Sequence, residues 1–414
     1  QDPEQEPEQD PEQEPEQESA ERVLFIYDNK YMSSVNELKN LRTSQGYIVV
    51  EKEINYGNIS LNNMNVKYNE LKGEVDAINN TTPLKYILIF GSIEEVPTYM
   101  KSGIDEFTTS TNQIVKEAAS DISYGHIQDS YEIIVGRLSP GDNLYGQSNE
   151  LTDNQRQQNV LNQVNKIKEY EEIINNITND SHTYDLNADW VRKIIGIASN
   201  EGQGYGIDGL SDNMYMRQEM ERYRNNLNCR YVELYQSNDN SGHLGKPANS
   251  DNNIEYDEVG DPNTIDLRTE INEGSPLLLY AGHADERTLS TTEFSNSNVS
   301  ELTNAGKYFL GCIVGCSLGS HDEDYMSLSE NLMVAENKGS VAMFASSILQ
   351  SWQPPMHMQR ELNTRILESE RTLTIGELFK DAVSNNTFAT NNDYWYYHIF
   401  GDPCTRYLLT LPQL

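Results

Sequence analysis

A cysteine and a histidine of this chain are placed where they could form a nucleophile and a base. His283 follows a short apolar run at 276–280, and Cys316 follows a second one at 307–314. Both runs are rich in large apolar residues and end at a glycine-containing turn, which is typical of buried strands in a parallel sheet. Because ligands bind at the carboxyl ends of such strands in open α/β sheets, a thiol and an imidazole delivered there could act as nucleophile and base.

Taken separately, each of these two residues has an ordinary structural interpretation. A free cysteine is among the most buried residue types, and a single histidine near a strand end is more often a hydrogen-bonded polar residue than a catalyst. Small residues surround both positions, and they favour a site because they let a substrate backbone approach. They are Ala281, Gly282, Ala284, Gly315, Ser317 and Gly319. From the residues alone, both interpretations stay open.

The composition indicates an acidic protein without a membrane span. The 414 residues carry 65 acidic and 30 basic side chains, a formal net charge of −35. This charge repels nucleic acid and anionic membranes, so we expect no nucleic-acid partner, and no apolar run approaches the roughly 20 residues that cross a bilayer. The four cysteines show no paired spacing that would predict a disulfide framework. We expect Cys229, Cys312 and Cys404 to be structural.

Residues 1–19 form an acidic tail of low complexity. The octamer QDPEQEPE occurs twice and is followed by QES. Regular proline, dense carboxylates and the lack of apolar residues leave no surface to bury, so we expect this tail to be disordered and to carry no chemistry. The chain starts with Gln and shows no initiator Met or signal peptide, which indicates a processed or trimmed form.

Strands and helices alternate through the rest of the chain, which predicts an α/β fold. We expect the strands at 22–28, 47–54, 85–91, 132–137, 190–199, 228–236, 276–280, 307–314, 340–348 and within 398–411. We expect the helices at 32–46, 61–80, 154–176, 212–226, 357–370 and 374–385. The β-α-β order implies parallel strands with right-handed crossovers.

The helix at 154–176 leads the chain away from the first strands, so we place a subdomain boundary near residue 180. We predict two subdomains, 20–180 with a small sheet and 181–414 with a larger one. Each sheet is expected to be mostly parallel and covered by helices on both faces.

A glycine-rich segment follows the expected strand at 190–199. The glycines of 202–206 form GxGxG rather than GxGxxG, and the next helix starts only after further polar residues, so we do not expect a phosphate-binding loop. Glu201 in the same segment could accept the outer ring N–H of His283 and fix its tautomer. The alternative interpretation of this residue is a solvent-exposed loop carboxylate.

The stretch 237–264 is long, polar and dense in Asn, Asp and Gly. It is either a solvated surface loop or a calcium site, because carboxylate and amide oxygens are the ligands that a hard cation takes. No spacing within it matches an EF-hand loop, so we assign no ligand residues.

Several sequence blocks match one known family in order and spacing. They are SDISYGHIQDSYEIIVGRLS (120–139), IIGIASNEGQGYGIDGLSDN (194–213), YAGHA (280–284), GCSLGS (315–320), SSILQSWQPPM (346–356) and HIFGDPC (398–404). Together they resemble the gingipain family of cysteine peptidases, which belongs to the caspase-like clan, and the resemblance is closest to the arginine-specific branch. It covers nearly everything after the tail and implies a caspase-like three-layer sandwich.

The resemblance assigns a role to each residue of a catalytic site. It implies Cys316 as the nucleophile, His283 as the proton-transfer group and Glu201 as the carboxylate that orients the histidine. The oxyanion would be held by the backbone N–H groups of Cys316 and of Ala284, the residue after the histidine. The family more usually has glycine at this position, and the extra Cβ could narrow the site. His321 is a rival base because it lies near Cys316 in the sequence.

The resemblance also implies a pocket for a basic side chain. Asp212, which on its own reads as part of a helix N-terminus, matches the aspartate at the floor of the S1 pocket in the arginine-specific members. Such a carboxylate accepts a bidentate hydrogen bond from a guanidinium. Gln350 and Trp352 match pocket residues of the same branch. Gln350 would accept a hydrogen bond from the guanidinium, and Trp352 would form an apolar wall for the arginine stem. Their ordinary interpretations are a surface residue and a core residue.

We therefore predict a cysteine endopeptidase that cleaves after basic residues, with Arg preferred over Lys at P1, through a Cys–His dyad and an acyl-enzyme. It would act on protein or peptide substrates as a secreted or cell-surface monomer. Its chemistry needs no cofactor, and structural calcium is typical of the family it resembles. The alternatives are a caspase-like transpeptidase or sortase, a catalytically inactive acidic binding module, and a nucleotide-binding α/β protein.

Overall fold

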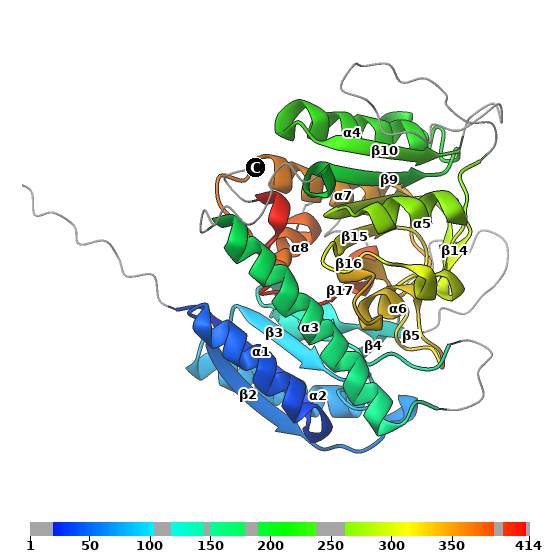
Figure 1. Cartoon of the computed structure of the whole chain (residues 1–414). Coiled ribbons are helices and arrows are strands. Elements are labelled where there is room, and N and C mark those ends of the chain that lie inside the picture. The colour runs from blue at the N-terminus through cyan, green and yellow to red at the C-terminus, as the bar shows by residue number, and fades with distance from the viewer. Residues whose placement is uncertain are drawn as a thin grey trace, which may run out of the picture.

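Ten strands form one central sheet in the computed structural model, which describes residues 20–102, 117–144, 150–178, 189–236, 261–384 and 392–410 (Figure 1). The strands are β1 (Arg22–Asp28), β2 (Ile48–Ile54), β3 (Tyr86–Phe90), β8 (Ile134–Leu138), β9 (Lys193–Ala198), β10 (Arg230–Tyr235), β11 (Leu277–Ala281), β15 (Phe309–Val314), β16 (Ser340–Ser346) and β17 (Tyr397–Phe400). Their order across the sheet is β10-β9-β11-β15-β16-β17-β8-β3-β1-β2. All neighbouring pairs in this sheet are parallel except β16 and β17, which are antiparallel.

The apolar runs of the sequence form the middle of this sheet. Every residue of β3, β11 and β15 is buried, as expected for parallel strands covered on both faces. Successive side chains point to opposite faces, so Leu277 and Leu279 join one hydrophobic cluster whereas Leu278 and Tyr280 join another. The predicted strands are confirmed with small shifts at their ends, except for the last one, and Cys312 is buried in the sheet.

Helices cover both faces of the sheet. They are α1 (Met32–Ser44), α2 (Leu61–Thr81), α3 (Asp153–Thr178), α4 (Asp212–Leu227), α5 (Thr264–Glu273), α6 (Leu328–Val334), α7 (Gln353–Leu367) and α8 (Ile375–Val383). In Figure 1, α1 and α3 lie side by side across the strands of the N-terminal half. In the other half, α5 and α6 pack against one hydrophobic cluster, whereas α4, α7 and α8 pack against the other. No helix within the described ranges is long and apolar enough to cross a membrane.

The sequence predicts two separate sheets, but the structure joins them edge to edge. β17 lies between β16 and β8, and one pair of facing residues, Phe400 and Arg137, links β17 to β8. This contact joins segments far apart in the chain, which periodicity cannot detect. The division of the chain into subdomains 20–180 and 181–414 stays a prediction.

Some predicted segments differ from the structure or lie outside it. The last strand, expected within 398–411, is β17 and ends at Phe400. The short helices α5 and α6 are not predicted from the sequence. The tail 1–19 and residues 237–260 of the polar stretch lie outside the described residues.

A buried arginine ties both halves of the sheet together. Arg42 lies on α1 and its side chain is fully buried. It donates to Glu171 Oε1, to Asp402 Oδ2 and to Thr405 Oγ1, each at 2.8 Å. Glu171 lies on α3 and also pairs with Arg406, while Asp402 and Thr405 follow β17. Because both carboxylates are buried, they need the guanidinium as a counter-charge.

Replacing Arg42 with alanine should destabilise the protein strongly. The variant leaves buried carboxylates short of a counter-charge, and breaking a buried pair costs about 3–5 kcal/mol of unfolding free energy. The control Arg365→Ala removes an ion pair with Asp381 in which the side chains are 40% and 38% exposed, and it should cost less than about 1 kcal/mol. Chemical denaturation of both variants measures the difference, and equal losses would contradict the role given to Arg42.

Candidate active site

β11 and β15 bring the expected base and nucleophile to the carboxyl ends of two neighbouring strands of the sheet. The strands pair in parallel with Ala281 opposite Val314, so the residues that follow them leave the sheet side by side. His283 and Cys316 line one pocket with a volume of about 290 Å³. The other lining residues are Asp212, Gly282, Val314, Gly315, Leu349, Gln350, Ser351 and Trp352. The structure therefore places the thiol, the imidazole and all three expected S1 residues around one pocket.

The thiol of Cys316 is held by the backbone of the segment that follows β16. The Gln350 N–H lies 3.5 Å from Sγ. Burial raises the pKa of the Cys316 thiol, the Gln350 N–H lowers it, and the charges of Asp393 and Glu286 raise it. In the described part of the chain, no hydrogen bond joins Cys316 to the ring of His283. Catalytic contacts of this kind often tighten only when substrate binds.

The residue after Cys316 has a strained backbone. Ser317 has a φ of +54°, in a region that residues other than glycine rarely adopt. Its N–H donates to the Ile348 carbonyl at 2.8 Å, and the Gly319 N–H donates to the Ser346 carbonyl at 2.8 Å. Because these bonds to the end of β16 hold the turn in place, the surrounding structure fixes the position of Cys316.

The imidazole of His283 contacts Glu201. Nε2 lies 2.8 Å from Glu201 Oε2, and because a carboxylate only accepts, Nε2 carries a proton and Nδ1 is left for proton transfer. Both side chains are 55% exposed, so water screens their interaction. The Trp352 ring packs edge-on against the imidazole with centroids 5.6 Å apart, and the Tyr280 hydroxyl donates to the His283 carbonyl. These contacts orient the imidazole without burying it.

Asp212 is a buried carboxylate at the start of α4. Ser199 donates to Oδ2 at 2.6 Å, and the Trp352 indole N–H donates to Oδ1 at 3.0 Å. Burial raises the pKa of Asp212 to about 6, although both hydrogen bonds lower it. The N-cap of this helix is Ser211, so Asp212 lies in the first turn, where the helix dipole favours a negative charge.

Gly202 allows the indole and the carboxylate to meet. It has a φ of +79°, and a Cβ at this position would lie 2.5 Å from Trp352 Nε1 and 2.8 Å from Asp212 Oδ1. Glycine is therefore required beside the pocket wall. This packing gives a physical reason for a glycine in the segment 202–206.

Gln350 is buried in the pocket wall, and its carboxamide contacts Tyr397. The Tyr397 hydroxyl oxygen lies 2.9 Å from Gln350 Oε1 and 2.9 Å from the Ile313 carbonyl oxygen. The amide nitrogen of Gln350 has no hydrogen-bond partner in the part of the chain that the structure describes. A phenol has only one proton, so it cannot donate fully to both oxygens.

The remaining candidates differ in where they lie. His321 does not line the pocket, and its buried Nδ1 lies 3.1 Å from the Gly319 carbonyl. Ala284 begins β12 (Ala284–Asp285) without a positive φ, so the position does not require glycine. The sequence did not single out four residues that support the pocket through contacts from distant segments, for which no local pattern exists: Ser199, Tyr280, Asp393 and Tyr397.

The sheet order, the covering helices and the pocket define a caspase-like α/β fold with a cysteine and a histidine at adjacent strand ends. A model of peptidase family C25 matches residues 16–408. The chain therefore belongs to peptidase family C25, the gingipain-like cysteine peptidases.

Individual relatives cover almost the whole chain. Gingipain R2 of Porphyromonas gingivalis is 25% identical over 404 residues, which are 92% of this chain and 45% of that protein. Gingipain R1 of Porphyromonas gingivalis is also 25% identical over 404 residues, 92% of this chain and 34% of that protein. The chain thus spans less than half the length of these curated relatives.

Two solved structures share the fold. The crystal structure of the Arg-specific cysteine proteinase gingipain R has a TM-score of 0.71 at 20% identity, and the match covers 94% of this chain and 78% of that chain. The complex of the pro- and mature domains of RgpB from Porphyromonas gingivalis has a TM-score of 0.70 at 20% identity, covering 93% and 79%. These matches establish the fold.

Asp212→Asn should stabilise the protein at neutral and alkaline pH. The raised pKa means that the folded state binds this proton more tightly than the unfolded state, so the stabilisation from protonation is present at low pH and is lost as pH rises through about 6. A shift from 3.8 to about 6 corresponds to about 3 kcal/mol. Thermal unfolding should show the variant to be more stable near pH 8 and similar to the parent near pH 4. If the variant is no more stable than the parent near pH 8, burial of the Asp212 charge does not cost the stability expected here.

Proposed function

We propose that this chain is an active cysteine endopeptidase that cleaves peptide bonds after basic residues and prefers Arg over Lys at P1. The observation that carries the proposal is one pocket lined by the Cys316 thiol, the His283 imidazole and the buried Asp212 carboxylate. The first two groups supply a nucleophile and a base. The third supplies a negative charge that a cationic side chain can pair with. Membership of peptidase family C25 supports the same function.

The proposed reaction proceeds through an acyl-enzyme. Cys316 Sγ attacks the scissile carbonyl carbon while its proton passes to Nδ1 of His283. The attack forms a C–S bond and leaves an oxyanion on the former carbonyl oxygen. The backbone N–H groups of Cys316 and Ala284 hold the oxyanion. The oxyanion then collapses, the C–N bond breaks, and the imidazolium protonates the leaving amine. Water then attacks the thioester carbonyl carbon and gives a proton to His283. The C–S bond breaks, the Cys316 thiolate leaves, and the imidazolium returns the proton to the thiolate.

The environment of the thiol favours proton transfer during the attack over a preformed thiolate. Burial raises the pKa of Cys316, so the thiol keeps its proton at neutral pH in the free protein. Glu201 accepts the Nε2–H of His283 and stabilises the imidazolium that forms when Nδ1 takes the thiol proton. His283 therefore acts first as a general base and then as a general acid.

Asp212 can accept a guanidinium in addition to its present partners. Each carboxylate oxygen has two lone pairs, and the hydrogen bonds from Ser199 and Trp352 use one on each oxygen. The remaining lone pairs suit the parallel N–H groups of a guanidinium. The indole of Trp352 offers an apolar wall for the stem of the P1 side chain and a ring face for its cation.

The contacts of the Gln350 carboxamide give it an orientation that favours Arg over Lys. The Ile313 carbonyl can only accept, so it takes the single proton of the Tyr397 hydroxyl. The group of Gln350 that faces this hydroxyl must then be the NH₂, which gives the buried amide nitrogen the partner it lacks. The amide oxygen is left to accept from the pocket. A guanidinium, with five N–H donors in a plane, can reach both this oxygen and Asp212 more readily than an ammonium.

The wider setting of the activity is part of the proposal. Protein or peptide substrates follow from the proposed reaction. The net charge of −35 opposes binding to nucleic acid and anionic membranes and favours a monomer. A secreted or cell-surface location is proposed from the similarity to gingipains. Structural calcium also stays a proposal, because residues 237–260 of the stretch that suggested it lie outside the described residues.

Cys316→Ala should abolish cleavage of arginyl peptides, with a loss of roughly 10³-fold or more in kcat. An arginyl chloromethyl ketone should modify Cys316, and mass mapping of the peptides identifies the labelled residue. Cys312→Ala is the matched control, because this thiol is buried in β15 and should not affect labelling.

Undiminished turnover in Cys316→Ala, or labelling of another residue, would overturn the proposed nucleophile. Ligated product after addition of an amine nucleophile would indicate the transpeptidase alternative.

Tyr397→Phe should lower the preference for Arg over Lys. The variant frees the carboxamide of Gln350 to rotate, so the ratio of kcat/KM for matched Arg and Lys substrates should fall by about tenfold, the value of one buried hydrogen bond. Tyr396→Phe is the control, because the Tyr396 hydroxyl donates to the Lys101 carbonyl at 3.2 Å and this residue does not line the pocket. Equal kcat/KM for Arg and Lys substrates in the parent protein would contradict the proposed specificity itself.

A further inference from the structure

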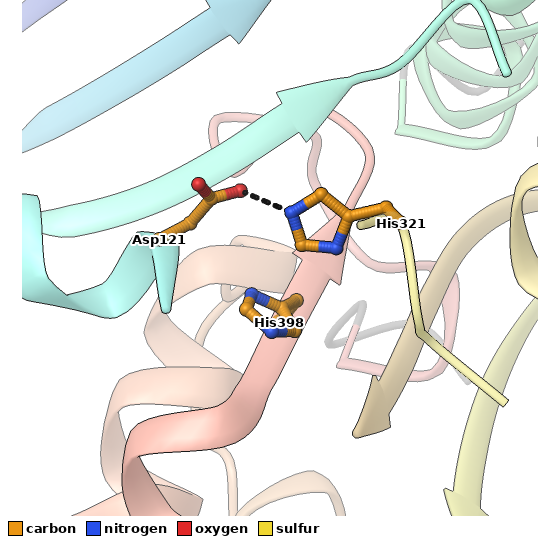
Figure 2. Close-up of side chains that lie close together, drawn as sticks. All are labelled: Asp121, His321 and His398. Carbon is orange, nitrogen blue, oxygen red and sulfur yellow. Dashed lines mark ion pairs between the residues drawn. The ribbon is translucent and has the colours of Figure 1, made fainter. Parts of the chain in front are cut away.

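A second cluster of polar side chains is buried outside the catalytic pocket. Asp121 begins the short helix η2 (Asp121–Gly125), His321 follows the turn after β15, and His398 lies on β17. The three side chains converge from separate segments of the chain (Figure 2). They are 4%, 6% and 2% exposed, and each offers a ligand atom within 4.8 Å of the others. Two imidazoles and a carboxylate at this spacing are a ligand set for a metal ion.

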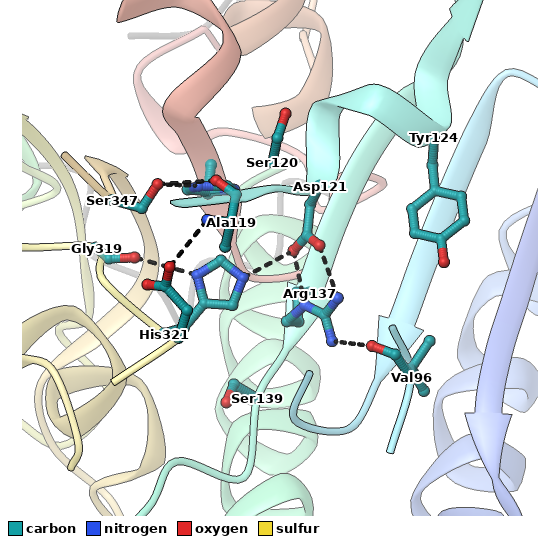
Figure 3. A network of polar contacts seen from close by, with 12 residues as sticks. Val96, Ala119, Ser120, Asp121, Tyr124, Arg137, Ser139, Gly319, His321 and Ser347 are labelled. Atoms are coloured by element: carbon teal, nitrogen blue, oxygen red, sulfur yellow. Dashed lines mark hydrogen bonds and ion pairs between the residues drawn. The ribbon is translucent and has the colours of Figure 1, made fainter. Parts of the chain in front are cut away.

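Contacts around the cluster determine which imidazole nitrogens carry protons. His321 Nδ1 lies 3.1 Å from the Gly319 carbonyl, which can only accept, so Nδ1 is protonated (Figure 3). His398 Nε2 lies 3.1 Å from Ser347 Oγ, and Ser347 donates its own proton to the Ala119 carbonyl at 2.9 Å. His398 therefore donates from Nε2. The other nitrogens, His321 Nε2 and His398 Nδ1, are buried, and among the described residues neither has a hydrogen-bond partner, although His321 Nε2 lies within ion-pair distance of Asp121.

A second proton on His321 would satisfy only part of this arrangement. The resulting imidazolium would form an ion pair with Asp121, whose Oδ2 lies 3.4 Å from His321 Nε2 (Figure 2). Charge-assisted hydrogen bonds are shorter, at about 2.7–2.9 Å. The second proton would also leave Nδ1 of His398 buried without a partner. A separation of 3.4 Å instead matches the edge of a tetrahedron around an ion with bonds of about 2.0–2.1 Å, which is roughly 3.3 Å.

We propose that Asp121, His321 and His398 form a buried structural site for Zn²⁺. Both histidines donate their outer N–H to an oxygen of the protein, the arrangement that orients imidazole ligands toward a metal. Two nitrogen ligands suit zinc, whereas Ca²⁺ and Mg²⁺ take oxygen ligands. The burial of all three side chains makes the role structural and separate from the catalytic pocket.

Arg137 is the group that opposes a cation at this place. It donates from Nε to Asp121 Oδ2 at 2.6 Å and from Nη2 to Oδ1 at 2.7 Å. Each carboxylate oxygen keeps a second lone pair for an ion, and the guanidinium holds the carboxylate in one orientation. Asp322, whose carboxylate accepts the Ala119 N–H at 3.0 Å, brings a second negative charge close to His321.

An ion at this site would connect three parts of the fold. Asp121 belongs to the N-terminal half, His398 lies on the strand that joins the halves, and His321 continues the turn that carries Cys316. Zinc would therefore fix the nucleophile segment to the junction of the sheet.

The test is zinc binding to the full chain carrying Cys316→Ala and His283→Ala, because the thiol and imidazole of the catalytic pocket would otherwise bind zinc as well. Excess Ca²⁺ in the buffer suppresses weak binding to the many carboxylates. Metal analysis after dialysis and calorimetric titration with Zn²⁺ should give one tightly bound ion per chain, and zinc should raise Tm. Substitution with Co²⁺ should give the visible absorption of a tetrahedral site.

Variants in the same background locate the ion. His321→Gln and His398→Asn should lose tight binding, whereas His357→Gln, which changes a histidine of α7 outside the cluster, should keep it. Ser347→Ala retains all three ligands and removes an outer hydrogen bond, so it should weaken zinc binding by 10- to 100-fold even where a ligand variant fails to fold. Absence of stoichiometric zinc in the parent, or unchanged affinity in the ligand and Ser347→Ala variants, would overturn the site and leave an ion pair between His321 and Asp121.

Discussion

The parallel register of β11 and β15 is the constraint on which the catalytic pocket depends. Leu277 pairs with Leu310 and Ala281 with Val314, so both strands end level and His283 leaves the sheet beside the cysteine. A slip of one residue would move every side chain of a strand to the opposite face. Because both strands are buried on two faces, such a slip is costly. The hydrophobic core therefore brings the thiol and the imidazole together without a polar contact between them.

Within the pocket, burial opposes the ionised forms of two groups, and the proposed function needs only the second of them, the Asp212 carboxylate. It raises the pKa of the Cys316 thiol and of the Asp212 carboxyl. A cationic side chain counters the second effect, since a nearby opposite charge favours the ionised carboxylate. Under the proposed function, binding of a basic P1 side chain and deprotonation of Asp212 would therefore be coupled, and each would favour the other. An uncharged side chain gains nothing from this coupling, so under the proposed function the burial that raises the pKa of Asp212 would also favour cationic side chains.

The sequence predicts the parts of the structure that depend on local pattern. Runs of large apolar residues identify the strands, and the positions just after two of them identify the histidine and the cysteine of the pocket. The junction of the sheet at Phe400 and Arg137 is not predictable in this way, because one pair of residues joins distant segments. By local pattern alone Asp212 resembles an ordinary helix N-terminus. The family resemblance predicts it as a pocket residue, and in the structure it lines the pocket and accepts hydrogen bonds from Ser199 and Trp352.

Buried arginines hold the place where the two halves of the sheet meet. Only one pair of facing residues joins β17 to β8, and apolar burial is non-directional, so it does not by itself align two strands. Arg137 on β8 donates to Asp121 and to two backbone carbonyls, and Arg42 connects α1 and α3 to the segment after β17. Guanidinium groups offer several donors in a fixed plane, so they impose an orientation on these segments. Because the turn that carries Cys316 continues to His321, which lies against Asp121, the alignment of Cys316 depends on this junction as well as on its own strand.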